Sequence, residues 1–178
     1  MKSLKLLTLG ATLTLALVFS AQAAFANTTP AETKTLATIA AIDKNEILIG
    51  LVAKNKKITH GVKDLANMMI DQHSANLTQI LEMANQLHAM PLTSSTAIKL
   101  TAAGNKGMLQ IAALNGNQFD HAYVNAMVSG HEAALKLIDT QLMQTAQSAE
   151  MKKFMVSTRA TVAMHLACAL KLQKKMGV

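Results

Sequence analysis

Four ionisable residues stand where the sequence otherwise repeats apolar side chains at helical spacing. Each interrupts a row of apolar residues three and four positions apart: Glu46, His73, His131 and His165. Imidazole nitrogens and a carboxylate oxygen are suitable ligands for Zn, Fe, Mn or Cu ions. Such groups are costly to bury without a partner. If the four side chains converge, the sequence predicts a site for one transition-metal ion.

Their distances from the predicted turns place these residues at one height. Glu46 and His73 lie 13 and 14 residues from Thr59, and the other two histidines lie 17 residues on either side of Ser148. Because a helix rises about 1.5 Å per residue, each antiparallel pair should be level to within one turn. We therefore expect the four residues to share one buried layer.

Capping and turn residues divide the chain into four long helices. Thr29-Pro30-Ala31-Glu32 is typical of a capping box with proline at the first helical position. Thr59, Asn117 and Ser148 are suitable caps for three further helices, of which the first should end before Pro91. The predicted helices span about 30–58, 59–89, 117–146 and 148–178.

Residues 92–117 lack the continuous apolar pattern of these helices. They suggest a short helical stretch from about Ser95, a break at Gly104-Asn105-Lys106-Gly107 and a second short apolar piece. We interpret the segment as a partly helical crossover between the second and third long helices. The expected fold is all-α, a ferritin-like four-helix bundle made by residues 27–178.

The composition supports this fold class and indicates export. The 178 residues are 51% hydrophobic but 3% aromatic, with 2 Pro and 8 Gly, which favours helices over sheets. Lys2 and Lys5, an apolar run over 6–19 and two Ala-x-Ala sites predict a secretory signal peptide over 1–26. Cleavage after Ala23 or Ala26 fits equally well. We expect a periplasmic protein, with outer-membrane association or secretion as alternatives.

Other features exclude several classes of function. The net charge is +7, but the lysines are scattered and few aromatic rings accompany them, so nucleic-acid binding is not expected. No run after the signal is long and apolar enough to span a membrane. The sequence contains no recognisable nucleophile set, phosphate loop or dinucleotide fingerprint. A non-enzymatic role is therefore favoured, and the oligomeric state is left open.

Two variants of the metal site can be weighed from the sequence. A di-iron centre is disfavoured because no Glu-x-x-His occurs. Soft ligands around the histidines would favour copper, although methionine at helical spacing is usually core filler. The candidate surrounding residues are Met69, Asn76, Met127 and Cys168.

A layer without metal is the alternative. Glu46 would then accept hydrogen bonds from histidines, and Asn76 or Tyr123 would complete the network. The protein would in that case be a metal-free structural, stress-protective or interaction protein of the cell envelope, associating with partners or with the membrane surface.

Several short motifs occur in a fixed order along the chain. They are Met69-x-Asp71-x-His73 with Asn76, Phe119-Asp120-x-x-Tyr123-x-x-x-Met127-x-x-x-His131, and the single residues Glu46 and His165. Together they resemble the exported bacterial family called domain of unknown function 4142, over about residues 35–175. The resemblance implies a ferritin-like four-helix bundle, export and no settled activity.

The resemblance also carries over a set of polar positions. They fall on Glu46, Asp71, His73, Asp120, His131 and His165. Asp120 lies near a predicted helix start, where a carboxylate favours the helix dipole and a structural role is expected. Ala160 stands where members of the family often have a proline, so the last helix should be straighter here.

Overall fold

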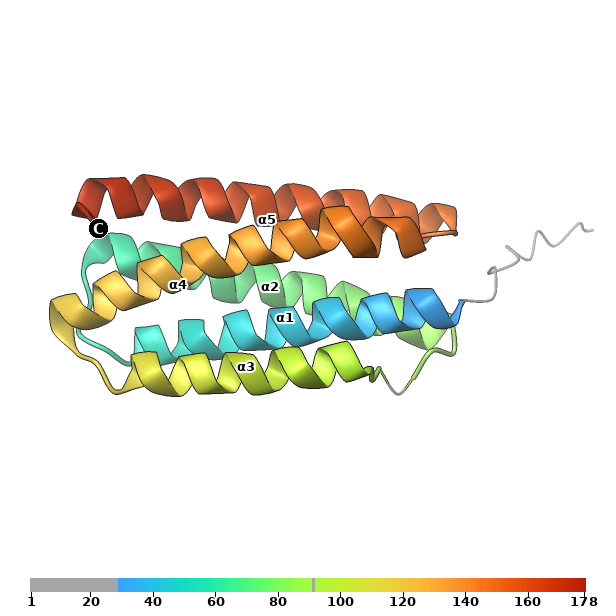
Figure 1. Cartoon of the computed structure of the whole chain (residues 1–178), viewed down its shortest axis with the longest axis horizontal. Helices are drawn as coiled ribbons and strands as arrows, with labels where there is room; N and C mark the ends of the chain where they lie inside the picture. Colours follow the sequence, from blue (N-terminus) through green and yellow to red (C-terminus); the bar gives the residue numbers. More distant parts are fainter. Residues whose placement is uncertain (1–28, 91) are drawn as a thin grey trace, which may run out of the picture.

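A computed structural model describes residues 29–90 and 92–178 (Figure 1). This part of the chain is all-helical, as the composition predicts. Its α helices are α1 (Pro30–Lys54), α2 (His60–Gln86), α3 (Ser95–Ala112), α4 (Gly116–Leu137) and α5 (Ala149–Met176). Within the described residues no helix combines the length and apolar character needed to cross a membrane. The predicted signal peptide lies outside the described residues.

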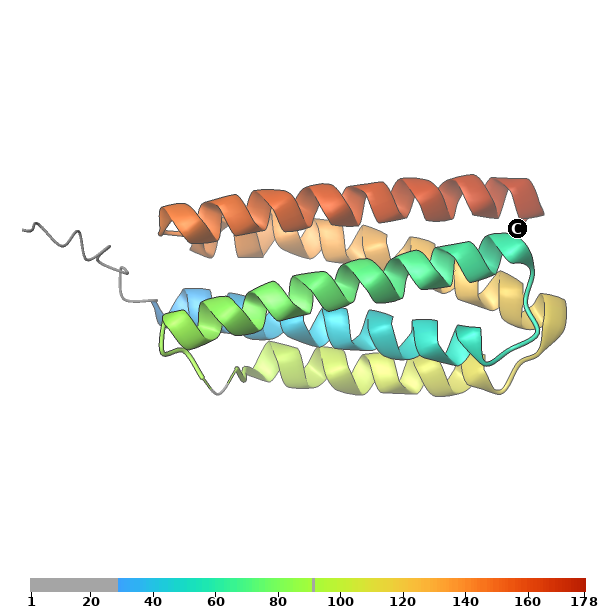
Figure 2. The ribbon, with the colours of Figure 1, turned by 180° about the vertical axis from the view of Figure 1, so that it is seen from behind.

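The five helices lie roughly side by side along the long axis of the molecule (Figures 1 and 2). Helix α1 packs against α2 and α3, α4 packs against α5, and α2 contacts α5 and α4. This arrangement brings residues far apart in the sequence to the same level of the interior.

Local capping explains where the helices begin. In α1 the Thr29 hydroxyl accepts from the Glu32 N–H at 3.1 Å, and the Glu32 carboxylate accepts from the Thr29 N–H at 3.0 Å. In α5 the Ser148 hydroxyl accepts from the Met151 N–H at 3.1 Å. These side chains satisfy N–H groups that the first turn of a helix leaves free. Helix α5 then continues without a break through Ala160.

The prediction of a broken crossover is wrong, because α3 is one continuous helix that includes Gly104 and Gly107. Helix α3 lies directly against α1, and a Cβ on Gly104 would collide with the side-chain amide of Asn45. That amide donates to the Leu100 carbonyl at 3.0 Å. Glycine costs about 1 kcal/mol in a helix interior relative to alanine. Here it permits the close approach of two helices instead of ending one.

The third long helix also differs from its prediction. Its N-cap is Asn115, not Asn117, and its α-helical part ends at Leu137. A π turn over Ile138–Leu142 and a 3-10 turn over Met143–Thr145 follow where a regular helix to residue 146 was expected. The Thr145 hydroxyl then lies 2.7 Å from that of Thr35 on α1.

Two apolar clusters fill the interior on either side of a polar layer. One contains Leu36, Ile80, Ile138 and Phe154, among others. The other contains Ile49, Met69, Phe119 and Val124, among others. On α1, α2, α4 and α5 one buried polar residue of the layer lies between the two clusters in sequence: Asp43, His73, His131 and His165, respectively. Thr158, also buried, lies one turn before Val162 on α5.

Candidate metal centre

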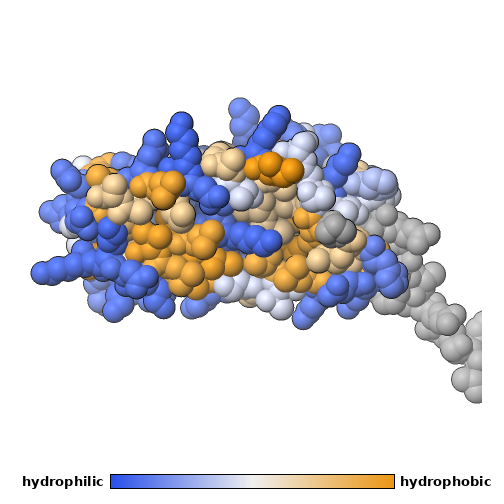
Figure 3. All heavy atoms as spheres, turned by 90° about the horizontal axis from the view of Figure 1, so that it is seen from below, coloured by the Kyte–Doolittle hydropathy of each residue, from blue (hydrophilic) through white to orange (hydrophobic). Residues whose placement is uncertain are grey.

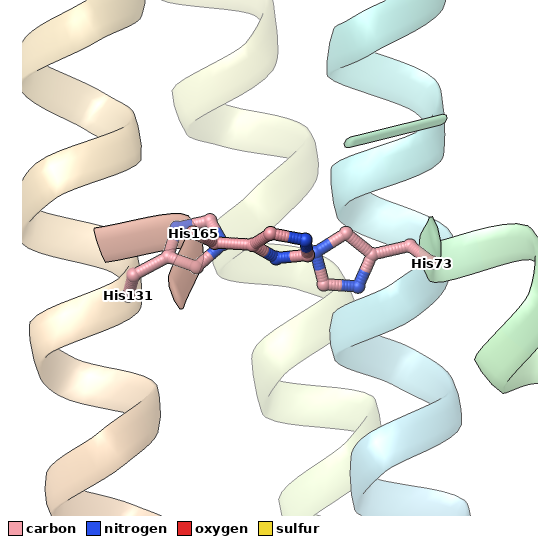
Figure 4. Close-up of side chains that lie close together, drawn as sticks. All are labelled: His73, His131 and His165. Carbon is pink, nitrogen blue, oxygen red and sulfur yellow. The ribbon is translucent and has the colours of Figure 1, made fainter. Parts of the chain in front are cut away.

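Three histidines from three different helices meet in this layer (Figure 4). His73 lies on α2, His131 on α4 and His165 on α5, and each is at most 3% exposed. One nitrogen from each ring lies within 4.8 Å of the others. The ring centroids are 4.9 to 5.8 Å apart. The sequence-predicted histidines are therefore brought together in a buried position.

One nitrogen of each ring is fixed by an oxygen outside the cluster. Carboxylate, carbonyl and amide oxygens accept hydrogen bonds, so the ring nitrogen facing each of them carries the proton. The contacts are His73 Nδ1 to Asp43 Oδ1 at 2.8 Å, His131 Nδ1 to the Met127 carbonyl at 2.7 Å, and His165 Nε2 to Gln72 Oε1 at 2.9 Å. These partners set both the tautomer and the orientation of the three rings.

The second nitrogen of each ring is buried and has no hydrogen-bond partner in the described residues. These atoms are His73 Nε2, His131 Nε2 and His165 Nδ1. With the other nitrogen protonated, each presents a lone pair. Buried polar atoms are nearly always satisfied, so three such atoms in one cluster call for a shared partner that accepts electron pairs.

Burial favours the neutral form of two of these rings, His131 and His165. Burial lowers the pKa of His131, although the charge of Glu46 partly opposes the shift. Burial, together with the other two histidines, lowers the pKa of His165 to about 3. Neutral imidazole is the form that binds metal ions. These two rings are therefore suited to binding a cation and unsuited to carrying an additional proton.

Asp43 is the buried carboxylate that pairs with the cluster, and sequence reasoning missed it. Burial raises its pKa, and the hydrogen bond from His73 opposes that shift. Asn76 donates to Asp43 Oδ2 at 2.9 Å and accepts from the Thr158 hydroxyl at 3.1 Å. The available signal was that Asp43 lies four residues after Ile39 and three before Glu46, on the same side of the helix.

Glu46 does not join the three histidines. It is half-buried, and its Oε2 atom is buried without a hydrogen-bond partner in the described residues. Its negative charge still acts on the interior. It opposes the lowering of the His131 pKa, and it adds to the larger effect of burial, which raises the pKa of Tyr123. Of the predicted four-residue layer, the three histidines thus lie together, and the Glu46 carboxylate is close enough to act on His131.

The predicted surrounding residues lie in different places. Met69 and Met127 are buried core residues, and only the backbone carbonyl of Met127 touches the cluster. Asn76 belongs to the Asp43 network. Cys168 is half-buried, with its thiol 3.8 Å from the Met164 sulfur. Among the described residues, no sulfur is hydrogen-bonded to the three rings, and the identity of the metal stays a prediction.

Of the two further acids carried over from the resemblance, neither touches the histidines. Asp71 is exposed. Asp120 is buried, and its Oδ2 accepts from the Thr59 N–H at 2.9 Å at the start of α2. Asp120, which lies on α4, therefore caps the neighbouring helix α2, and this is a structural role.

The geometry can be compared with that of a tetrahedral ion. Zn–N bonds of about 2.0–2.1 Å place ligand nitrogens roughly 3.3 Å apart. The histidine nitrogens lie within 4.8 Å, so each ring would close by about 1 Å around an ion. Three imidazoles leave a fourth position free, as in sites that also bind water or a small ligand. The residues present fit one ion.

Comparisons with known proteins place the chain in a family. Searches of curated proteins and of solved structures found no match. The family model described as "Domain of unknown function (DUF4142)" matches residues 18–172, which include α1 to α4 and all three histidines. The chain therefore belongs to the family described as domain of unknown function, DUF4142.

Proposed function

We propose that this protein binds one transition-metal ion through His73, His131 and His165. One observation carries the proposal: each ring has one nitrogen fixed from outside and the other buried without a partner. A single cation would satisfy all three nitrogens at once. A purely hydrogen-bonded layer would need donors facing them, and the described residues provide none.

The ligand set favours some ions over others. Imidazole suits Zn, Fe and Cu, whereas Mn prefers a larger share of oxygen ligands. The Glu46 carboxylate supplies a negative charge near the cluster and offsets part of the charge of a divalent ion. The free fourth position makes storage, sensing or a redox step the functions to consider.

The proposed setting is a ferritin-like four-helix bundle made by α1, α2, α4 and α5, with α3 as the crossover. Such bundles commonly place metal ligands on facing helices. Export to the periplasm is proposed from the basic, apolar and Ala-x-Ala pattern of residues 1–26. Metal binding would then occur outside the cytoplasm.

The test is elemental analysis of untagged protein, as purified and after reconstitution with Zn, Fe, Cu or Mn. We expect about one ion per chain. The variant His73→Ala/His131→Ala should lose it. A matched control, His60→Ala/His121→Ala, removes two exposed histidines and should keep the ion.

Less than half an ion per parent chain after reconstitution with every metal, or equal content in both double variants, would contradict the proposal. Circular dichroism checks that each variant is helical. If the first variant does not fold, His131→Asn, which keeps a polar side chain, takes its place. A metal-free structural role would instead leave the melting temperature unchanged by chelators.

A further inference from the structure

A cavity of about 400 Å³ lies between α1, α3 and α4. Its lining is largely apolar and includes Ile42, Ile49, Leu100, Met108, Ile111 and Leu137. Figure 3 shows the face of the molecule on which α3 lies, where hydrophobic areas alternate with hydrophilic side chains. The volume falls within the range of about 300–1,000 Å³ that is usual for small-molecule sites.

Glu46 is the one ionisable residue among the described residues that line this cavity. Its Oε1 would lie 3.7 Å from a Cβ on Gly130, so the glycine leaves that oxygen uncovered on the α4 side. Its Oε2 has no hydrogen-bond partner, and none of the ion pairs between described residues involves it. The cavity thus presents a carboxylate without a countercharge.

The other polar groups of the lining are few and partly engaged. Asn45 uses its amide N–H on the Leu100 carbonyl, and the Ser129 hydroxyl donates to the Ala126 carbonyl. A hard divalent ion would require several oxygen ligands. A single carboxylate in apolar surroundings instead fits a monovalent cation that carries its own apolar body.

We propose that this cavity binds a small molecule with an apolar body and one protonated amine, which pairs with Glu46. The body would displace water from the aliphatic lining, and the ammonium group would supply the missing charge. An anionic ligand would face like-charge repulsion, and a neutral one would leave the carboxylate unpaired. The inference goes beyond the metal centre and does not require it.

Three probes with the same aromatic body separate these cases: 2-phenylethylamine, 2-phenylethanol and 3-phenylpropionate. Titrations followed by NMR use the full domain in the presence of a chelator, so that no bound metal ion repels the amine. We expect the amine to bind about tenfold more tightly than the alcohol. The carboxylate should bind more weakly than both.

Variants then locate the site. Glu46→Gln should lower the affinity for the amine to that for the alcohol, and the affinity for the alcohol should not change. Ala103→Leu changes a residue of the lining, and it should weaken binding of both the amine and the alcohol about tenfold by filling the cavity. Ala102→Leu is the matched control, because Ala102 is the exposed neighbour on the same helix and is outside the lining.

Three results would overturn the proposal: no binding of the amine at millimolar concentration, equal affinity for the carboxylate, or equal weakening by the two leucine substitutions. The metal proposal fails separately. The variant His73→Ala/His131→Ala, which should lose metal, should bind the amine as the parent does, provided that it is folded.

Discussion

Two buried polar clusters contact helix α1, one through Glu32 and the other through Asp43, and they differ in how many of their polar atoms are hydrogen-bonded within the described residues. In the Glu32 corner, made by Thr29, Glu32, Gln147 and Ser148, one carboxylate accepts three backbone N–H groups and a hydroxyl at 2.9 to 3.2 Å. In the histidine cluster, one nitrogen of each ring is hydrogen-bonded and the other has no partner among the described residues. The Glu32 carboxylate is thus fully hydrogen-bonded, whereas the cluster has three nitrogens for which we propose a metal ion as the partner.

The pKa shifts follow the same contrast. Burial alone would raise the pKa of Glu32, but hydrogen bonds from Ser148, Thr29 and Gln147 outweigh it and lower that pKa. Burial lowers the pKa of His165, and the neighbouring rings add to this shift instead of compensating it, so that the pKa falls to about 3. Complete hydrogen bonding stabilises a charge at the corner, whereas burial disfavours a charge on His131 and His165.

The largest expected effect is stabilisation by metal. At a free Zn²⁺ concentration of 100 times Kd, binding to the folded state adds about 2.7 kcal/mol. That corresponds to roughly 5–10 °C in Tm for a domain of this size. Calorimetry of the parent should show the shift, and His131→Ala should show none. A shift of equal size in His131→Ala would mean that the two clusters do not differ as described.

Next in size is the loss of the corner. Glu32→Gln keeps the size of the side chain but places an NH₂ group among N–H donors. We expect a loss of about 2 kcal/mol in the free energy of unfolding, measured in urea. Glu82→Gln, at an exposed position of α2, is the control and should change little. Metal content should be the same in both, and a loss of metal in Glu32→Gln alone would break the distinction between the two clusters.

A smaller effect concerns the support of the histidine cluster. Asp43→Asn keeps an acceptor for His73 but removes the negative charge, and metal affinity should fall about tenfold. Isothermal titration with Zn²⁺ measures it, with Asp71→Asn as the exposed control. An unchanged affinity would show that Asp43 only orients the ring.

The smallest effect is the acid dependence of the corner. Because the folded-state pKa of Glu32 is lowered, its contribution is complete above the ordinary carboxyl pKa of about 4.3 and is lost as the pH falls through the lowered value. The difference in unfolding free energy between the parent and Glu32→Gln should therefore narrow below about pH 4. A difference that widens on acidification would contradict this sign.

The starts of α1, α2 and α5 and the convergence of the three histidines could be predicted because their signals are local or periodic. The Thr29 capping box depends on four consecutive residues. His73, His131 and His165 follow from interruptions of helical rows whose heights can be counted from the turns.

The carboxylate that pairs with His73 could not be chosen in this way. Asp43 and Glu46 lie three residues apart, which is about 60° around the helix and one turn along it. The rotation of α1 that points Asp43 inward is set by its packing against α2 and α3. Likewise, the glycines of α3 suggest a break until the close contact with Asn45 is known.

The π turn at Ile138–Leu142 gives α4 a change of phase. A π turn holds one residue more than an α turn, and each residue advances a helix by about 100°. The side of the helix on which His131 lies is therefore set independently of the side on which Thr145 and the Glu32 corner lie. If one residue were removed at this turn, the chain could keep either the position of His131 in the cluster or the contacts of the corner with α1, but not both.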